Sequence, residues 1–146
     1  MIRKASEKDA AVITAIGAAC FTEEAWREET VRRDMSLPHS LYFIDEEEGR
    51  AEGYSCFWFV ADEAQLVNIA VLPEARRKGI ASALMEAGME EAMRRGMASL
   101  FLEVRTGNLP AQALYRRHGM TVKALRKGVY EEPKEDGYIM GRDLNK

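Results

Sequence analysis

The sequence predicts one α/β domain built around a mixed β-sheet, and three of its features indicate this. The 146 residues suffice for a single core, and no repeat, low-complexity tract or linker divides them. Strand and helix patterns alternate in the order β-α-α-β-β-β-α-β-α-β-β. The nearly all-apolar strand pattern at residues 65–72 is followed by a loop and then by the longest helical pattern of the chain. We therefore expect residues 1–146 to form a single domain.

The first half of the chain predicts a short strand, two helices and three further strands. Residues 1–5 have a strand pattern, and Ser6 with Asp9 matches a capping box that announces a helix. Thr22, followed by two glutamates, predicts the start of a second helix, because a hydroxyl caps it and acids favour its positive end. Strands are expected where aromatic, β-branched and other apolar residues gather, at 41–44, 54–60 and 65–72.

The second half predicts a long helix, a strand, a short helix and two closing strands. Residues 79–95 carry apolar side chains at helical spacing, and Gly96 supplies a left-handed end. A strand is expected at 99–104. Asn108 caps the short helix that Gly119 ends. The closing strands are expected at 121–124 and 138–140.

Composition narrows the class of protein. Hydrophobic residues make up 47% and charged residues 31%, with a net charge of −3, so nothing favours a direct nucleic-acid partner. Cys20 and Cys56 lie among apolar neighbours, which indicates buried thiols and no zinc site. The start lacks the pattern of a signal peptide, and no apolar run approaches the ~18 residues of a membrane span. We expect a cytoplasmic protein that has no membrane partner and binds no metal.

The segment from Arg76 to Ser82 carries the strongest chemical signal. A buried strand runs into a basic loop with a glycine, and this loop opens a long helix. Unpaired backbone N–H groups and the helix dipole make such a helix start an anion site, suited to a pyrophosphate. Neither a P-loop nor a dinucleotide fingerprint occurs in the chain. By itself, the pattern also fits a plain loop–helix junction with a solvated basic surface.

Two motifs resemble those of a known family. Arg76-x-x-Gly79-x-Ala81 resembles the Q/R-x-x-G-x-G/A acetyl-CoA loop of the GNAT superfamily, and the segment from Asn108 to Gly119 resembles its second signature. The segments at 21–30 and 100–105 are similar to the RimI branch, which acetylates the N-terminal alanine of a small-subunit ribosomal protein. The resemblance implies the GNAT fold, with a mostly antiparallel central sheet flanked by helices. It also implies acetyl-CoA as co-substrate and the N-terminus of a ribosomal protein as partner.

The resemblance also implies a role for individual residues. Glu103 would be the general base and Tyr115 the general acid. Backbone groups that bind the pantetheine arm would come from Ile69, Ala70 and Val71, and Asn108 would bond the same arm. Backbone amides that hold the pyrophosphate would come from Arg77, Lys78, Gly79, Ile80, Ala81 and Ser82. Trp26 and Tyr130 would line the acceptor groove.

The chemistry of acetyl transfer suits these roles. An amine attacks a thioester only when neutral, and a protein α-amine, with a pKa of ~7.7–8.0, loses its proton more readily than a lysine at ~10.4. A carboxylate can take that proton, a strand N–H can stabilise the oxyanion, and a tyrosine can protonate the leaving thiolate. From the pattern alone, Glu103 also fits an outward residue of a half-exposed strand. Tyr115 also fits a core aromatic with its hydroxyl at the rim.

Several features leave alternatives open. The residues before Tyr130 are Gly128 and Val129, where the RimI branch usually has an aromatic, so acceptor preference can differ. Met120 replaces a common phenylalanine. Other possible functions are a GNAT enzyme for small amines and a non-catalytic acyl-CoA-binding module. His39 and His118 show no partner pattern and are expected at the surface or in turns.

Overall fold

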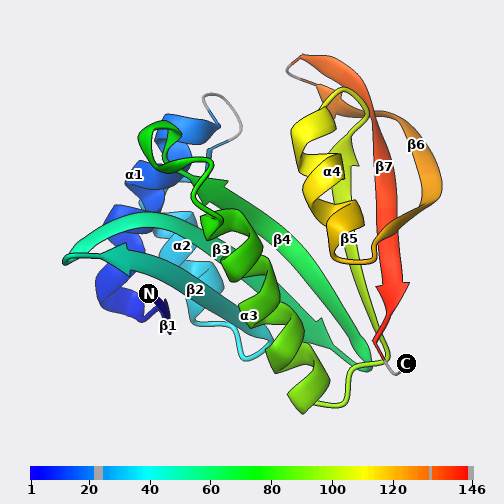
Figure 1. The fold of residues 1–146 in the computed structure, drawn as a ribbon. Helices are drawn as coiled ribbons and strands as arrows, with labels where there is room; N and C mark the ends of the chain where they lie inside the picture. Colours follow the sequence, from blue (N-terminus) through cyan, green and yellow to red (C-terminus); the bar gives the residue numbers. More distant parts are fainter. Residues whose placement is uncertain (22–24, 132, 145–146) are drawn as a thin grey trace.

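The computed structural model describes residues 1–21, 25–131 and 133–144 and shows one sheet with helices packed on both faces (Figure 1). Seven strands follow one another across this sheet in the order β1-β2-β3-β4-β5-β7-β6. Strands β4 and β5 are parallel, whereas every other neighbouring pair is antiparallel. The predicted α/β class with a mixed, mostly antiparallel sheet is thereby confirmed.

The elements follow the predicted order. The first half contains β1 (Ile2–Lys4), η1 (Glu7–Asp9), α1 (Ala10–Cys20), α2 (Glu28–Met35), β2 (Ser40–Glu47), β3 (Arg50–Val60) and β4 (Glu63–Val71). The second half contains η2 (Pro73–Ala75), α3 (Ile80–Arg94), β5 (Ser99–Arg105), α4 (Leu109–Arg117), β6 (Thr121–Glu131) and β7 (Lys134–Asp143). No helix among the described residues has the length and apolar character needed to cross a lipid bilayer.

Some boundaries differ from the prediction. The second helix begins at Glu28, and the predicted start at residues 22–24 lies outside the described residues. The two closing strands are longer than predicted, because β6 and β7 pair as a hairpin that continues well beyond their apolar parts. The predicted capping box is present, since the backbone N–H of Ser6 donates to the Asp9 carboxylate at 2.8 Å. It opens the short η1 turn ahead of α1.

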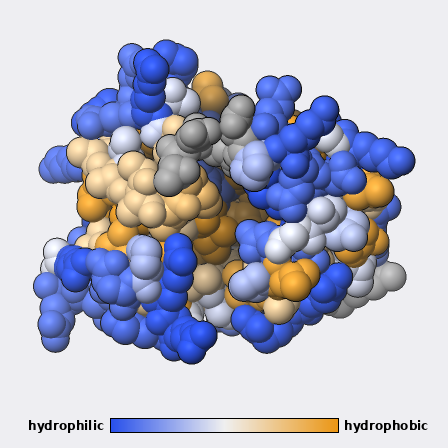
Figure 2. All heavy atoms as spheres, turned by 90° about the horizontal axis from the view of Figure 1, so that it is seen from above, coloured by the Kyte–Doolittle hydropathy of each residue, from blue (hydrophilic) through white to orange (hydrophobic). Residues whose placement is uncertain are grey.

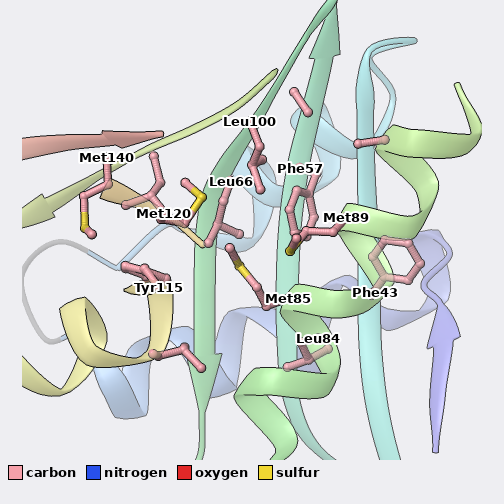
Figure 3. Close-up of a cluster of buried hydrophobic side chains, with 14 of the residues drawn as sticks. Phe43, Phe57, Leu66, Leu84, Met85, Met89, Leu100, Tyr115, Met120 and Met140 are labelled. Atoms are coloured by element: carbon pink, nitrogen blue, oxygen red, sulfur yellow. The ribbon is translucent and has the colours of Figure 1, made fainter. Parts of the chain in front are cut away.

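The sheet separates two apolar clusters. On one face, α3 and α4 cover a core that includes Phe57, Leu84, Met85 and Leu100 (Figure 3). On the other face, α1 and α2 cover a second apolar cluster. It includes Ile13, Ile16, Val31, Tyr42, Ile44, Tyr54 and Cys56. Both cysteines are free; Cys56 is buried and Cys20 half-buried.

A close approach of α3 to the sheet depends on one glycine. A Cβ atom built on Gly88 would lie 2.0 Å from Cζ of Phe57, so no side chain fits there. The ring of Phe57 therefore packs directly on the backbone of α3. This contact fixes how deeply α3, and with it the loop at its N-terminus, sits on the sheet.

The sheet opens in its middle, between the two parallel strands. Pairing of β4 with β5 runs only from Glu63 opposite Ser99 to Leu66 opposite Leu102. At the same point Val67 is an extra residue, since β3 pairs Phe57 with Leu66 but Cys56 with Asn68. Such a bulge bends its strand and ends regular pairing. The rest of β4, up to Val71, therefore has an edge that no strand covers on the side of β5.

Candidate functional site

The N-terminus of α3 lies at the open end of β4 and has the features expected of an anion site. Gly79 caps the helix with φ 80°, and Arg77 before it has φ 66°. A side chain on Gly79 would meet nothing within 4 Å, so the backbone is open to an approaching ligand. Arg77, Lys78 and Gly79 are exposed. The unpaired N–H groups of the first helical turn and the positive end of the dipole face the same space.

Arg76 makes two contacts that the sequence pattern does not reveal. Its Nε donates to the carbonyl oxygen of Val71 at 3.1 Å, and its Nη2 lies 3.7 Å from Sγ of Cys20. The Cys20 thiol donates to the same carbonyl at 3.3 Å. Arg76 therefore ties the end of β4 to the end of α1, and it remains exposed, as Arg77 and Lys78 are.

Two further polar contacts frame the anion site. The hydroxyl of Ser82 lies 2.7 Å from Nε2 of His118, which joins the first turn of α3 to the end of α4. His118 is thus half-buried and paired, a role that no local pattern announced because 36 residues separate the partners. Asn108 caps α4, since its side-chain oxygen accepts from the N–H of Ala111 at 3.2 Å. The predicted cap is confirmed, and the predicted bond of Asn108 to pantetheine stays a prediction.

Glu103 faces away from the core of its strand. Leu100, Leu102 and Val104 of β5 are buried on the side of α3 and α4, so the alternation turns Glu103 to the opposite face. Its Oε2 accepts a hydrogen bond from Nη1 of Arg126 on β6 at 3.1 Å. The side chain of Glu103 is 25% exposed, which leaves the carboxylate accessible to an acceptor.

Gly137 in β7 provides the floor beside Glu103. A Cβ atom at Gly137 would lie 2.8 Å from Val129, 2.9 Å from Tyr130 and 3.5 Å from Cγ of Glu103. Because this position has no side chain, residues of β5 and β6 approach each other across β7. Val129 fills part of this space. It precedes Tyr130, in the stretch where the RimI branch usually has an aromatic residue.

Tyr115 reaches the same region from the other face of the sheet. It is buried on α4 among the core side chains (Figure 3). Burial, and next the neighbouring Tyr130, raise the pKa of Tyr115. Burial and then the Glu103 carboxylate raise the pKa of Tyr130 to about 12, although Arg105 opposes them. Tyr130 therefore lies within electrostatic range of both Glu103 and Tyr115, where β4 and β5 part.

The predicted acceptor residues lie on different parts of the molecule. Trp26 is half-buried against the cluster beneath α1 and α2, whereas Tyr130 belongs to β6 and packs under the guanidinium of Arg105 at 4.3 Å. Among the described residues no ring contact joins them. Figure 2 shows a hollow with hydrophobic atoms on its floor between an apolar side and a strongly hydrophilic side. The described residues hold no group of three potential metal ligands.

A comparison with known protein families shows to which family the chain belongs. The model of the acetyltransferase (GNAT) family matches residues 12–120, a range that includes the anion loop, Glu103 and Tyr115. The chain belongs to the GNAT family. Proteins of this family use acetyl-CoA as co-substrate, and this chain is accordingly an acetyl-CoA-dependent acetyltransferase. The predicted family and enzyme class are confirmed.

Individual relatives are similar over most of their length. The [ribosomal protein bS18]-alanine N-acetyltransferase of Escherichia coli is 36% identical over 122 residues, which cover 82% of each chain. A Bacillus subtilis protein provisionally given the same name is 34% identical over 130 residues, which cover 89% of this chain and 86% of that one. The crystal structure of the E. coli ribosomal-protein-S18-alanine N-acetyltransferase superposes with a TM-score of 0.92 at 30% identity, covering 100% of this chain and 94% of that one.

The residues of this acetyltransferase fit acetyl-CoA. The uncovered edge of β4 beyond Leu66 offers backbone donors and acceptors to an extended amide-containing arm, as an added strand would use them. The open backbone at Gly79 and the first turn of α3 suit its pyrophosphate. The bulge at Val67, the uncovered edge of β4 and the N-terminus of α3 follow one another along the chain. One extended ligand can therefore contact all three.

Proposed function

We propose that this acetyltransferase moves the acetyl group of acetyl-CoA to the N-terminal amine of a protein. The acceptor we propose is the N-terminal alanine of ribosomal protein bS18, a protein of the cytoplasm. The identity to enzymes named for that reaction over four-fifths of each chain supports the acceptor. The observation that carries the proposal is the partly exposed carboxylate of Glu103 beside the opening between β4 and β5.

The proposed placement of the co-substrate follows the open strand and the helix start. Backbone groups of Ile69, Ala70 and Val71 hold the pantetheine arm, with Asn108 at its side. The pyrophosphate lies on the amides from Arg77 to Ser82. This placement brings the acetyl group to the bulge at Val67, where Glu103 and Tyr115 approach from opposite faces of the sheet.

The proposed chemistry is one direct transfer. Glu103, directly or through water, accepts a proton from the acceptor ammonium, and the neutral nitrogen attacks the acetyl carbonyl carbon. A backbone N–H of β4 near Ile69 to Val71 stabilises the oxyanion. When the carbon–sulfur bond breaks, Tyr115 gives its proton to the leaving thiolate, and the second proton of the acceptor nitrogen returns to the Tyr115 phenolate through water. Glu103 then releases its proton to solvent. The raised pKa of Tyr115 keeps its phenolic proton in place over the neutral pH range.

A competition between two peptides tests the acceptor class. One peptide has a free N-terminal alanine; the other has the same sequence, a blocked N-terminus and a free lysine. We expect higher kcat/KM for the free N-terminus, because its lower pKa lets a carboxylate complete the deprotonation. Higher kcat/KM for the lysine peptide, or for a free polyamine, would contradict the proposal and favour a small-amine acetyltransferase.

A further inference from the structure

Arg126 and Glu103 form an ion pair that crosses the candidate site. Nη1 of Arg126 donates to Oε2 of Glu103 at 3.1 Å, and the two side chains are 56% and 25% exposed. Arg126 belongs to β6, the last strand of the sheet, and Glu103 to β5, with β7 between them. The arginine therefore reaches over a neighbouring strand to place its charge on the carboxylate.

The local backbone is built for this reach. Arg126 pairs with Gly137 of β7, and because Gly137 has no side chain, side chains from β5 and β6 approach each other over it. Directly after Arg126 the regular pairing of β6 stops and resumes at Tyr130. Gly128 in between has φ 62°, and its N–H donates to Asp136 at 2.7 Å. The irregular stretch brings Tyr130 and Arg126 together around the same carboxylate.

The two arginines near this carboxylate are held differently. Arg105 stacks on Tyr130, donates to the carbonyl of Pro133 at 2.8 Å and to Glu135 at 3.2 Å, and is largely buried. Arg126 is mostly exposed, and the only described group to which it donates a hydrogen bond is Glu103. Arg105 is thus fixed in the frame of the site, whereas Arg126 can leave Glu103 by rotating its side chain into solvent.

We infer that Arg126 is a positioning residue that occupies the cation position on Glu103 in the empty site and is displaced by the acceptor's ammonium group. This inference rests on the proposed function, in which Glu103 receives the acceptor proton. The guanidinium and the ammonium compete for one carboxylate, because both are cations that donate N–H bonds to it. An ion pair this exposed is weak, so an entering ammonium can replace it.

After displacement, Arg126 affects the proton transfer as well. Arg126 remains attached to β6 beside the carboxylate, and a charge acts over about 10 Å, the Debye length at moderate salt. A nearby cation disfavours the charged form of the bound amine and so promotes loss of its proton. Among the described residues, the charged groups that act on the neighbouring Tyr130 of β6 are Glu103 and Arg105 on β5, Glu135 on β7 and Arg126 itself. Because Tyr130 is neutral, the positive charges of Arg105 and Arg126 offset the negative charges of Glu103 and Glu135 before the acceptor binds.

The test is steady-state kinetics of Arg126→Gln with an N-terminal alanine peptide at two pH values. At pH ~7, where the α-amine is mostly charged, we expect KM for the peptide to fall about 2- to 5-fold, the range of an exposed ion pair. We expect kcat to fall as well and KM for acetyl-CoA to stay constant. At pH ~9 the amine is neutral, and the variant should approach the wild type.

Controls separate this role from a structural one. Lys123→Gln removes the same charge from the same strand and should leave peptide KM and kcat unchanged. Arg126→Lys keeps the charge and should lie near the wild type, and equal melting temperatures show that the fold is retained. In a Glu103→Gln background, Arg126→Gln should have no further effect on peptide KM. An unchanged or raised peptide KM in Arg126→Gln at pH ~7 overturns the inference.

The experiment also distinguishes this inference from the proposed function. Absence of wild-type turnover with N-terminal peptides overturns the proposed function, and the inference that depends on it falls too. Wild-type turnover that needs Glu103, combined with an Arg126→Gln variant that matches the wild type, overturns the inference alone.

Discussion

The anion site at the start of α3 makes the sharpest prediction about the co-substrate. We expect Gly79→Asp to abolish or strongly weaken the binding of CoA while the protein stays folded. A Cβ atom at this position meets nothing within 4 Å, so the new side chain starts in open space. The backbone has φ 80°, which Asp and Asn tolerate better than most residues. The carboxylate would project into the space that the pyrophosphate needs.

The magnitude follows from Coulomb's law. A carboxylate about 4 Å from a phosphate oxygen is repelled by about 1 kcal/mol in water and about 4 kcal/mol at the effective dielectric of a protein surface. With tenfold in affinity for each 1.4 kcal/mol, the loss is about 5- to 10³-fold. Steric crowding of the pyrophosphate adds to this loss, because the native backbone presents no side chain there.

Two matched variants isolate the cause. Gly79→Asn has nearly the same shape without the charge, so its difference from Gly79→Asp measures the repulsion. Gly96→Asp places the same residue beyond the other end of α3, where φ is 73° and a side chain again meets nothing within 4 Å. Isothermal titration calorimetry with CoA should show wild-type affinity for Gly96→Asp. A folded Gly79→Asp that binds CoA as tightly as the wild type would refute the assigned anion site.

Three further predictions concern catalysis and stability. Tyr115→Phe and Glu103→Gln should each lower turnover by about 10²- to 10⁴-fold with little change in CoA affinity, and full turnover in either variant rules out that residue's role. Gly88→Ala should lower the free energy of unfolding by at least about 1–3 kcal/mol, because its Cβ would overlap Phe57; exposed Glu86→Ala on the same helix is the control in urea denaturation. Burial raises the pKa of Tyr115 in the folded protein, so the unfolded chain ionises first. Stability should therefore fall as pH rises past ~10, and equal urea midpoints at pH ~8 and ~10.5 would contradict this.

Local signals of the sequence were enough for the order of elements and for the anion loop. Gly96 and Gly119 have positive φ and Asn108 caps its helix, as their positions in the sequence predict. These features depend on residues only a few positions apart, and their physics is that of one turn of backbone. The loop from Arg76 to Ser82 is such a feature, and its assignment as the acetyl-CoA loop stays a prediction.

Features that depend on contacts between residues far apart in the chain could not be predicted from the sequence. The bulge at Val67 exists only in the register between β3 and β4, and the face of Glu103 became certain only from the burial of its neighbours. The ion pair between Arg126 and Glu103 joins residues 23 positions apart, so no local pattern marks it. The contact between Arg76 and the thiol of Cys20 joins residues 56 positions apart, so no local pattern marks it either.

One measurement tests the central claim most directly. A peptide that carries both a free N-terminal alanine and an internal lysine is incubated with the enzyme and acetyl-CoA, and tandem mass spectrometry locates the new acetyl group. Both amines are then present at equal concentration in the same molecule. The account predicts acetylation of the N-terminal amine, with loss of that product in Glu103→Gln. An acetyl group found mainly on the lysine, or no acetylated peptide while free polyamine is acetylated, would contradict it.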